Sequence, residues 1–146
     1  SVYPKNVKNI LYWVYNPLPY KLTNQTILMS LSTFIQKISN NENISFDETI
    51  SVISENYIYQ AAEFTNGLAT DVLTNAAGTN EGSCKLFAFA KVNSLDGQAT
   101  LNCFGDYYSV DVMQNPEGQD HQNIRNFMVT GWEGISFQDV ALVPIK

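Results

Sequence analysis

The sequence has little charge, little cysteine and almost no histidine. Charged residues make up 15% of the 146 residues, and only eight are Lys or Arg, so the formal net charge is −6. Scattered basic residues disfavour a nucleic-acid partner, because binding to a phosphate backbone depends on clustered Lys and Arg. Two cysteines exclude a disulfide-dense mini-protein and a four-ligand zinc site. No run of about 18 apolar residues occurs, so we predict no membrane-spanning helix.

Apolar residues are nevertheless abundant enough for a folded core. They make up 45% of the sequence, and 12% of all residues are aromatic, which is typical of a globular chain. A chain of this length predicts a single domain over residues 1–146. Neutral polar residues replace the missing charges and include sixteen Asn. Such surfaces are typical of extracellular binding modules and self-assembling proteins; an AT-rich genome would also raise the Asn content.

Residues 1–80 are predicted to hold one strand and the helical part of the fold. Residues 7–15 are apolar on both faces of a strand. Over residues 25–39 apolar side chains recur every three or four positions, which indicates an amphipathic helix. A capping box, Ser45 with Glu48, predicts the start of a second helix. That helix either continues to about residue 76 or breaks near Gly67.

Residues 84–146 are predicted to form the sheet. Alternation from Cys84 to Val92 indicates a strand, and Asn93–Gly97 reads as a hairpin loop. Further strands are expected over residues 99–103, 107–113, 124–131 and 135–143, with a polar loop at 114–123. The sequence therefore predicts an α+β fold with an N-terminal strand and two amphipathic helices packed on one face of a 4–6-stranded antiparallel sheet.

Few side chains are suited to catalysis. His121 follows Asp120, and the pair could act as a general base, but we favour a solvated loop residue. The oxygen-rich loop 114–120 could bind calcium, although it lacks the full EF-hand pattern. Glycosidases use two carboxylates, and six acids of the predicted sheet half could supply such a pair. We favour the interpretation that these acids are solvated residues in turns. They are Asp106, Asp111, Glu117, Asp120, Glu133 and Asp139. We therefore predict a non-enzymatic protein with no catalytic residue, no metal and no cofactor.

The two cysteines fall on opposite arms of the predicted hairpin. Cys84 and Cys103 both have the parity of core-facing residues. A disulfide between them needs a bulge or a shifted pairing, because the predicted hairpin leaves them about three residues out of register. We favour the alternative, in which two buried thiols act as small hydrophobic residues.

Aromatic residues are the most informative excess. Trp132 lies in Gly131–Gly134, at a predicted hairpin tip where burial is difficult. Tyr107 and Tyr108 point to opposite faces of their predicted strand. Exposed rings stack on sugars, anchor at lipid interfaces or contact proteins. We therefore predict Trp132, Glu133, Tyr107 and Tyr108 as ligand- or surface-binding residues; the alternative is a two-sided core with Trp132 folded into a bend.

The C-terminal half has one resemblance to a known family. The predicted strand Lys85–Val92, the return strand with Cys103 and the last strand Ile135–Pro144 resemble the sheet of cytolytic insect toxins. Those proteins wrap a sheet in helical hairpins, and their helical part is longer than the 80 residues that precede the sheet here. The resemblance implies a toxin-like protein.

The leading functional prediction is a non-enzymatic secreted or released binding protein, toxin-like, located outside the cell that makes it. Its partner would be a membrane surface or a glycan, bound through exposed aromatic residues, and not a nucleic acid. The alternative is a self-assembling or structural protein, or an inhibitor-type interaction domain. Its partner would then be another protein chain or a second copy in a homo-oligomer. Two observations favour this alternative. The chain has little charge, and the apolar face of the predicted strand 84–92 that carries Phe87 and Phe89 must be covered by helices or by another chain.

Overall fold

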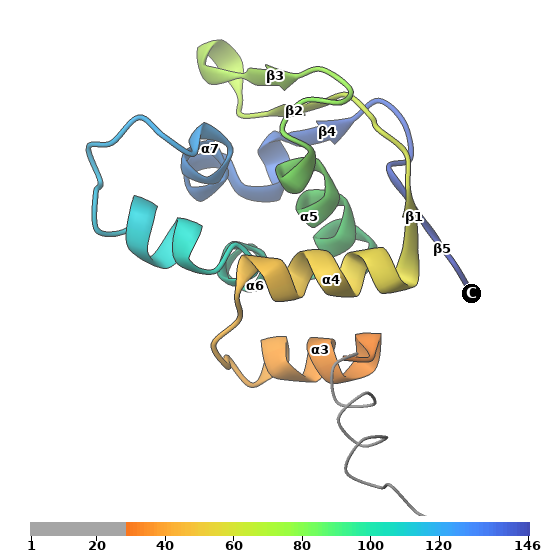
Figure 1. Cartoon of the computed structure of the whole chain (residues 1–146). Coiled ribbons are helices and arrows are strands. Elements are labelled where there is room, and N and C mark those ends of the chain that lie inside the picture. Colours follow the sequence, from red (N-terminus) through yellow and green to blue (C-terminus); the bar gives the residue numbers. More distant parts are fainter. Residues whose placement is uncertain (1–28) are drawn as a thin grey trace, which may run out of the picture. The chain divides into compact units, whose positions relative to one another are not determined.

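The computed structural model describes residues 29–146, whose helices and strands fall in one unit, Leu31–Lys146 (Figure 1). The fold is α+β, as predicted, and helices predominate. The α-helices are α3 (Leu31–Ser39), α4 (Phe46–Asn56), α5 (Glu81–Val92), α6 (Gly97–Asn102) and α7 (Gln122–Thr130). The strands are β1 (Tyr57–Tyr59), β2 (Phe64–Asn66), β3 (Leu73–Asn75), β4 (Ile135–Phe137) and β5 (Leu142–Pro144). The predicted strand 7–15 and the first part of the predicted helix 25–39 lie outside the described residues.

The strands of the described part form two small antiparallel sheets instead of the one predicted sheet. One sheet has the order β3-β2-β4, and the other pairs β1 with β5. Phe64 of β2 lies opposite Asn75 and Phe137, and Ile58 of β1 lies opposite Val143. Both β4 and β5 therefore pair with strands far away in the sequence, and the predicted strand 135–143 is divided between the two sheets.

Helix α5 occupies the middle of the unit, between α4 and the sheet β3-β2-β4 (Figure 1). The predicted strand Cys84–Val92 is therefore wrong. A helix that is buried on all sides has no polar face, so its periodicity cannot be told from that of a strand. The two lysines of α5 extend over aromatic rings, Lys85 over Tyr59 and Lys91 over Phe137. The buried residues of this helix are Cys84, Leu86, Phe87, Ala88, Phe89 and Ala90.

The capping box at the start of α4 is confirmed. The Glu48 backbone N–H donates to Ser45 Oγ (3.1 Å), and the Ser45 backbone N–H donates to Glu48 Oε2 (3.0 Å). The helix ends at Asn56 and does not continue to residue 76. Residues 57–59 instead extend into β1, because their aromatic and β-branched side chains pair with β5.

Three other predicted strands are also helical. Residues 99–103 lie mostly in α6, residues 107–113 mostly in the π-helix Tyr107–Val112, and residues 124–131 mostly in α7. The loop after Asn93 is correctly placed, but Asp96 ends it as the N-cap of α6, accepting from the Ala99 backbone N–H at 2.8 Å. Because the segments compared with the toxin sheet are largely helical, the structure does not support that resemblance.

Both cysteines are free and buried. Cys84 lies in α5, where its Sγ donates to the Ala62 carbonyl at 3.5 Å. Cys103 follows α6, and burial raises the pKa of its thiol to about 12. The interpretation as two buried thiols therefore agrees with the structure, and the disulfide is not formed.

Candidate functional site

The candidate site surrounds Tyr107, at the start of the π-helix. π-Helices are rare and frequently occur at functional sites. Tyr107 is 44% exposed, and its ring centre lies 5.2 Å from that of Phe46 and 5.1 Å from that of His121. Tyr107 thus separates two grooves. The α4 groove, about 310 Å³, includes Asp47 and Asp106, and the α7 groove, about 420 Å³, includes His121 and Asn123.

Two glycines lie close to Phe46, Gly82 against its ring and Gly105 against its backbone. A Cβ at Gly82, inside α5, would lie 2.8 Å from the Phe46 ring. Gly105 has φ +60°, and a Cβ there would lie 2.8 Å from the Phe46 backbone nitrogen. A side chain at Gly105 would press on the backbone at the start of α4, whereas one at Gly82 would displace the Phe46 ring.

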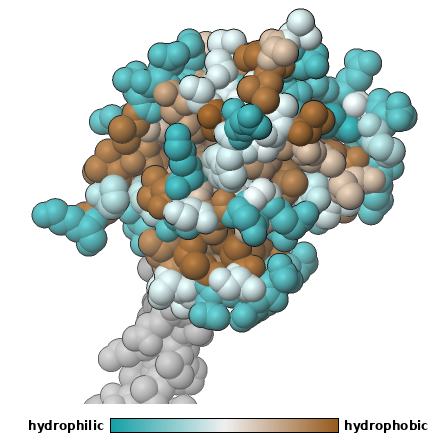
Figure 2. Space-filling model, turned by 180° about the vertical axis from the view of Figure 1, so that it is seen from behind, coloured by the Kyte–Doolittle hydropathy of each residue, from teal (hydrophilic) through white to brown (hydrophobic). Residues whose placement is uncertain are grey.

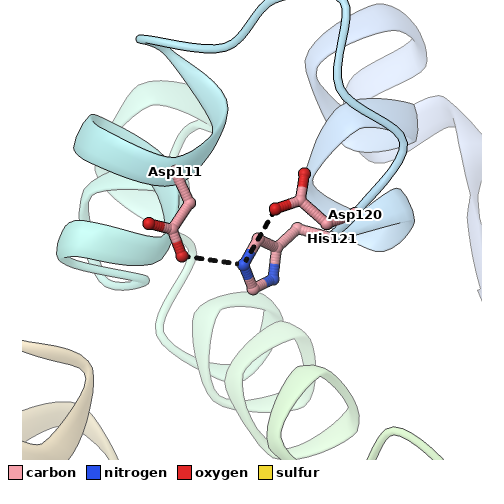
Figure 3. Close-up of side chains that lie close together, drawn as sticks. All are labelled: Asp111, Asp120 and His121. Atoms are coloured by element: carbon pink, nitrogen blue, oxygen red, sulfur yellow. Dashed lines mark hydrogen bonds and ion pairs between the residues drawn. The ribbon is translucent and has the colours of Figure 1, made fainter.

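A cluster of His121, Asp111 and Asp120 borders the α7 groove (Figure 3). His121 Nε2 lies 3.0 Å from Asp111 Oδ2 and 3.8 Å from Asp120 Oδ2. Asp111 belongs to the π-helix, whereas Asp120 and His121 come directly before α7. His121 has φ +52°, a left-handed conformation that is uncommon for a residue with a side chain. The sequence places Asp120 beside His121, but only the fold adds Asp111.

Arg125 fills the oxygen-rich loop that the sequence suggests for calcium. Its guanidinium donates to the Asp120 carboxylate at 2.6 Å, to the Asp120 carbonyl at 2.6 Å and to the Asn115 carbonyl at 3.0 Å. The hydrogen bond from Arg125 lowers the pKa of Asp120 below its usual value. Because the loop oxygens already bind this cation, they do not form a calcium cage.

Buried amides attach α7 to the sheet and so position His121. The Asn66 side chain donates to the Asn123 carbonyl at 2.8 Å, and Asn123 donates to Asn75 Oδ1 at 2.8 Å. All three side chains are buried. The high Asn content suggests that Asn side chains lie on the surface, so the sequence does not predict a buried network of three of them. Only the long-range pairing of β2 with β3 and the packing of α7 reveal it.

Trp132 is not an exposed residue at a hairpin tip. It lies in the 3₁₀ helix Gly131–Gly134 and is half-buried. Its indole N–H donates to the Leu95 carbonyl at 2.9 Å, and its ring lies 5.2 Å from that of Phe127. Trp132 is therefore folded into a bend against the core, as in the alternative interpretation. The neighbouring Glu133 is exposed.

Of the four predicted binding residues, Tyr107 and Tyr108 lie in grooves near each other. Tyr108 is half-buried and lines a third groove, about 220 Å³, together with Asn43 and Asn102. Trp132 belongs to the contacts between α5 and α7 instead. The His121 cluster lies beside Tyr107, and the binding role of Tyr107 and Tyr108 stays a prediction.

The surface also carries apolar side chains. Figure 2 shows hydrophobic areas interrupted by polar side chains on the face opposite to that of Figure 1. Among the exposed apolar residues are Ile58, Val92, Val140, Val143 and Ile145, from the region of β1, β5 and the end of α5. Among the described residues, no helix combines the length and hydropathy needed to cross a membrane.

Comparisons with known proteins identify the family. The family described as HopJ type III effector protein matches residues 31–142. A solved structure described as "Crystal structure of unknown function protein VPA0580" is 50% identical, with a TM-score of 0.75, over 80% of this chain and 94% of that one. No curated protein matches the chain. Type III effectors are secreted proteins, which supports the predicted class of secreted or released protein. The chain belongs to the HopJ type III effector protein family.

Proposed function

We propose that the protein is a secreted, non-enzymatic binding protein that holds a basic segment of a partner protein at Tyr107. The observation that carries this proposal is the exposed Tyr107 ring, which lines both an acidic groove and the groove that contains His121. Asp47 and Asp106 line one groove, and His121 in the other is bonded to Asp111. The effector family to which the chain belongs supports a protein partner.

The chemistry of this surface suits Lys and Arg side chains. The face of a tyrosine ring attracts a cation within about 6 Å of its centre. Carboxylates form charge-assisted hydrogen bonds with the same groups. The net charge of −6 would favour encounter with a basic partner. The acidic surroundings disfavour the cytoplasmic leaflet of a membrane, because its anionic lipids attract basic proteins.

The reactive groups of the chain support binding rather than catalysis. Cys84 and Cys103, the strongest potential nucleophiles, are buried, and burial raises the pKa of both thiols. A buried thiol with a raised pKa is inert, because the thiolate is the nucleophile. His121 contacts the carboxylates of Asp111 and Asp120 and the ring of Tyr107.

Fluorescence anisotropy with labelled peptides tests the proposal. Short Lys/Arg-rich peptides are expected to bind, and Asp/Glu-rich peptides of the same length are not. Tyr107→Ala should weaken binding about fivefold, since an exposed cation–π contact contributes about 1 kcal/mol. Asp106→Asn should also weaken it. Asp139→Asn, which changes an exposed acid outside both grooves, is the matched control.

Equal binding of basic and acidic peptides would contradict the proposal. So would a Tyr107→Ala protein that binds basic peptides as tightly as the wild type. A glycan array and liposome flotation, run with the same variants, measure the other two classes of partner. If the protein binds a glycan or liposomes through Tyr107 but binds no peptide, its partner is a glycan or a membrane instead of a protein.

A second candidate function is self-association through the sheet β1-β5. Ile58 and Val143 lie directly opposite each other, and their side chains are 54% and 41% exposed. Within residues 29–146 this sheet has two strands, and such edges can add a strand from another chain. Light scattering at high protein concentration should then detect dimers or larger assemblies, and Ile58→Lys should restore the monomer. A strict monomer would exclude this function.

A further inference from the structure

Three side chains with metal-binding atoms meet at His121, which lines the α7 groove. One carboxylate oxygen from Asp111, one from Asp120 and a ring nitrogen of His121 all lie within 4.8 Å of one another (Figure 3). The donors of one ion with bonds of about 2.1 Å lie about 3 Å apart. Asp111 Oδ2 and His121 Nε2 are already 3.0 Å apart, and Asp120 Oδ2 lies 3.8 Å from the same nitrogen. Because the donors are within 4.8 Å of one another, binding one ion requires the Asp120 carboxylate to move toward both of the other ligands.

Neighbouring residues hold these donors in place. Arg125 bonds to Asp120 Oδ1 and leaves Oδ2 directed toward His121. The Tyr107 ring, 5.1 Å away, packs against the imidazole. Outer-shell contacts of this kind orient the ligands of metal sites. The cluster therefore differs from a chance group of solvated acids, because a guanidinium and an aromatic ring orient two of its three members.

We infer that Asp111, Asp120 and His121 bind a divalent transition-metal ion such as Zn²⁺ or Mn²⁺. One imidazole and two carboxylates form a mixed nitrogen and oxygen set, which suits these ions better than Ca²⁺, whose ligands are six to eight oxygens. The ion takes the place of the proton between Nε2 and Asp111. A cationic ring releases that proton to solvent and keeps the one at Nδ1. A neutral ring that carries its proton at Nε2 releases it there and takes up one from solvent at Nδ1, so its net charge is unchanged.

The ion would connect two elements that the chain separates. Asp111 lies in the π-helix, and His121 comes before α7, with the loop 113–121 between those two elements. Three protein ligands leave further coordination positions for water or for a group of a bound partner, beside Tyr107. The inference goes beyond the proposed function, because it needs no partner.

Calorimetric titration of the metal-free protein with ZnCl₂ and MnCl₂ tests the inference. One equivalent of Zn²⁺ is expected to bind. Asp111→Asn and His121→Gln should each lower its affinity at least tenfold, and Arg125→Gln about tenfold, as for an outer-shell residue. Asp139→Asn is the matched control, since this exposed acid lies outside the cluster and outside the peptide-binding grooves. It should bind Zn²⁺ as the wild type does.

Because the chain has a single histidine, NMR spectroscopy of the wild-type protein gives a second measurement that needs no variant. Zn²⁺ should shift the resonance of Nε2, and Mn²⁺ should broaden the signals of His121 and Tyr107 first. Absence of saturable binding at millimolar metal would overturn the inference. Equal affinity of the His121→Gln protein, or broadening that begins elsewhere, would also overturn it.

Peptide binding is measured in EDTA, which removes metal ions. The proposed function and the metal site are therefore tested independently. Metal binding without peptide binding contradicts only the proposed function. Peptide binding without metal binding contradicts only the metal site.

Discussion

At the scale of single residues, the buried amide network places strict demands on the sequence. Asn123 donates to Asn75 and accepts from both Asn66 and Asn75. A buried polar group without a partner costs about 1–3 kcal/mol, so each member depends on the others. The network also determines where α7 begins, and with it the position of His121.

Removal of one amide should destabilise the whole unit. Asn123→Ala removes one hydrogen bond from Asn66 and two from Asn75. Asn66 still donates to the backbone carbonyl at position 123, and Asn75 still accepts from Asn80, so the free energy of unfolding is expected to fall by about 1–2 kcal/mol. Urea denaturation followed by circular dichroism measures the change. Asn40→Ala, at an exposed position, should change it by less than about 0.5 kcal/mol. Similar values for the two variants would show that the network contributes little.

Trp132 is expected to contribute to stability. Its ring contacts Phe87 and Phe127, and its N–H is bonded to Leu95. Trp132→Ala should lower the free energy of unfolding by about 3 kcal/mol, the lower end for such a truncation because the ring is half-buried. Guanidinium denaturation checks this, with Val129→Ala at an 84% exposed side chain as the control. If Trp132→Ala abolished binding to a glycan or a membrane but left the stability unchanged, Trp132 would be a binding residue, as predicted from the sequence.

At the scale of secondary-structure elements, the capping box of α4 also connects this helix to α3. Glu48 Oε1 accepts from Lys37 Nζ at 3.0 Å, while Oε2 caps Ser45. Partial burial raises the pKa of Glu48, but the hydrogen bond from Ser45 and the contact with Lys37 outweigh it. The pKa therefore lies below its usual value of 4.5. One carboxylate thus both starts a helix and joins it to its neighbour.

This lowered pKa predicts a pH-dependent coupling between Lys37 and Glu48. The unfolded state binds the Glu48 proton more tightly, so the stabilisation is present above pH 4.5 and is lost as the pH falls through the folded-state pKa. A double-mutant cycle with Lys37→Gln and Glu48→Gln should give about 0.5 kcal/mol at pH 7. The coupling should vanish near pH 2. An equal coupling at both pH values would rule out the charged pair as its source.

At the scale of the whole molecule, burial of the thiols reports on the integrity of the core. Cys84 and Cys103 are 1% and 0% exposed. Ellman's reagent should therefore find no reactive thiol in the native protein at neutral pH and two per chain after denaturation without reductant. Val129→Cys, on the surface, should react at once in the native state. No thiol in the denatured wild type would indicate a disulfide.

The same thiols should limit stability in alkali. Burial raises the pKa of both above the ordinary 9.0, and that of Cys103 to about 12. The folded state holds these protons more tightly, so their contribution is present below pH 9 and is lost as the pH rises toward the folded-state value. The free energy of unfolding should fall over this range. A Cys103→Ala protein should show a smaller fall, and an equal fall would contradict this cause.

The sequence by itself determined features that depend on neighbouring residues. The capping box of Ser45 and Glu48 and the loop after Asn93 need only a few positions, and both were predicted correctly. Tertiary structure decided the rest. Whether residues 84–92 form a strand or a helix depends on burial from every side, which their own periodicity does not record. Likewise, β1 pairs with β5, and Asp111 meets His121, across segments that only packing brings together.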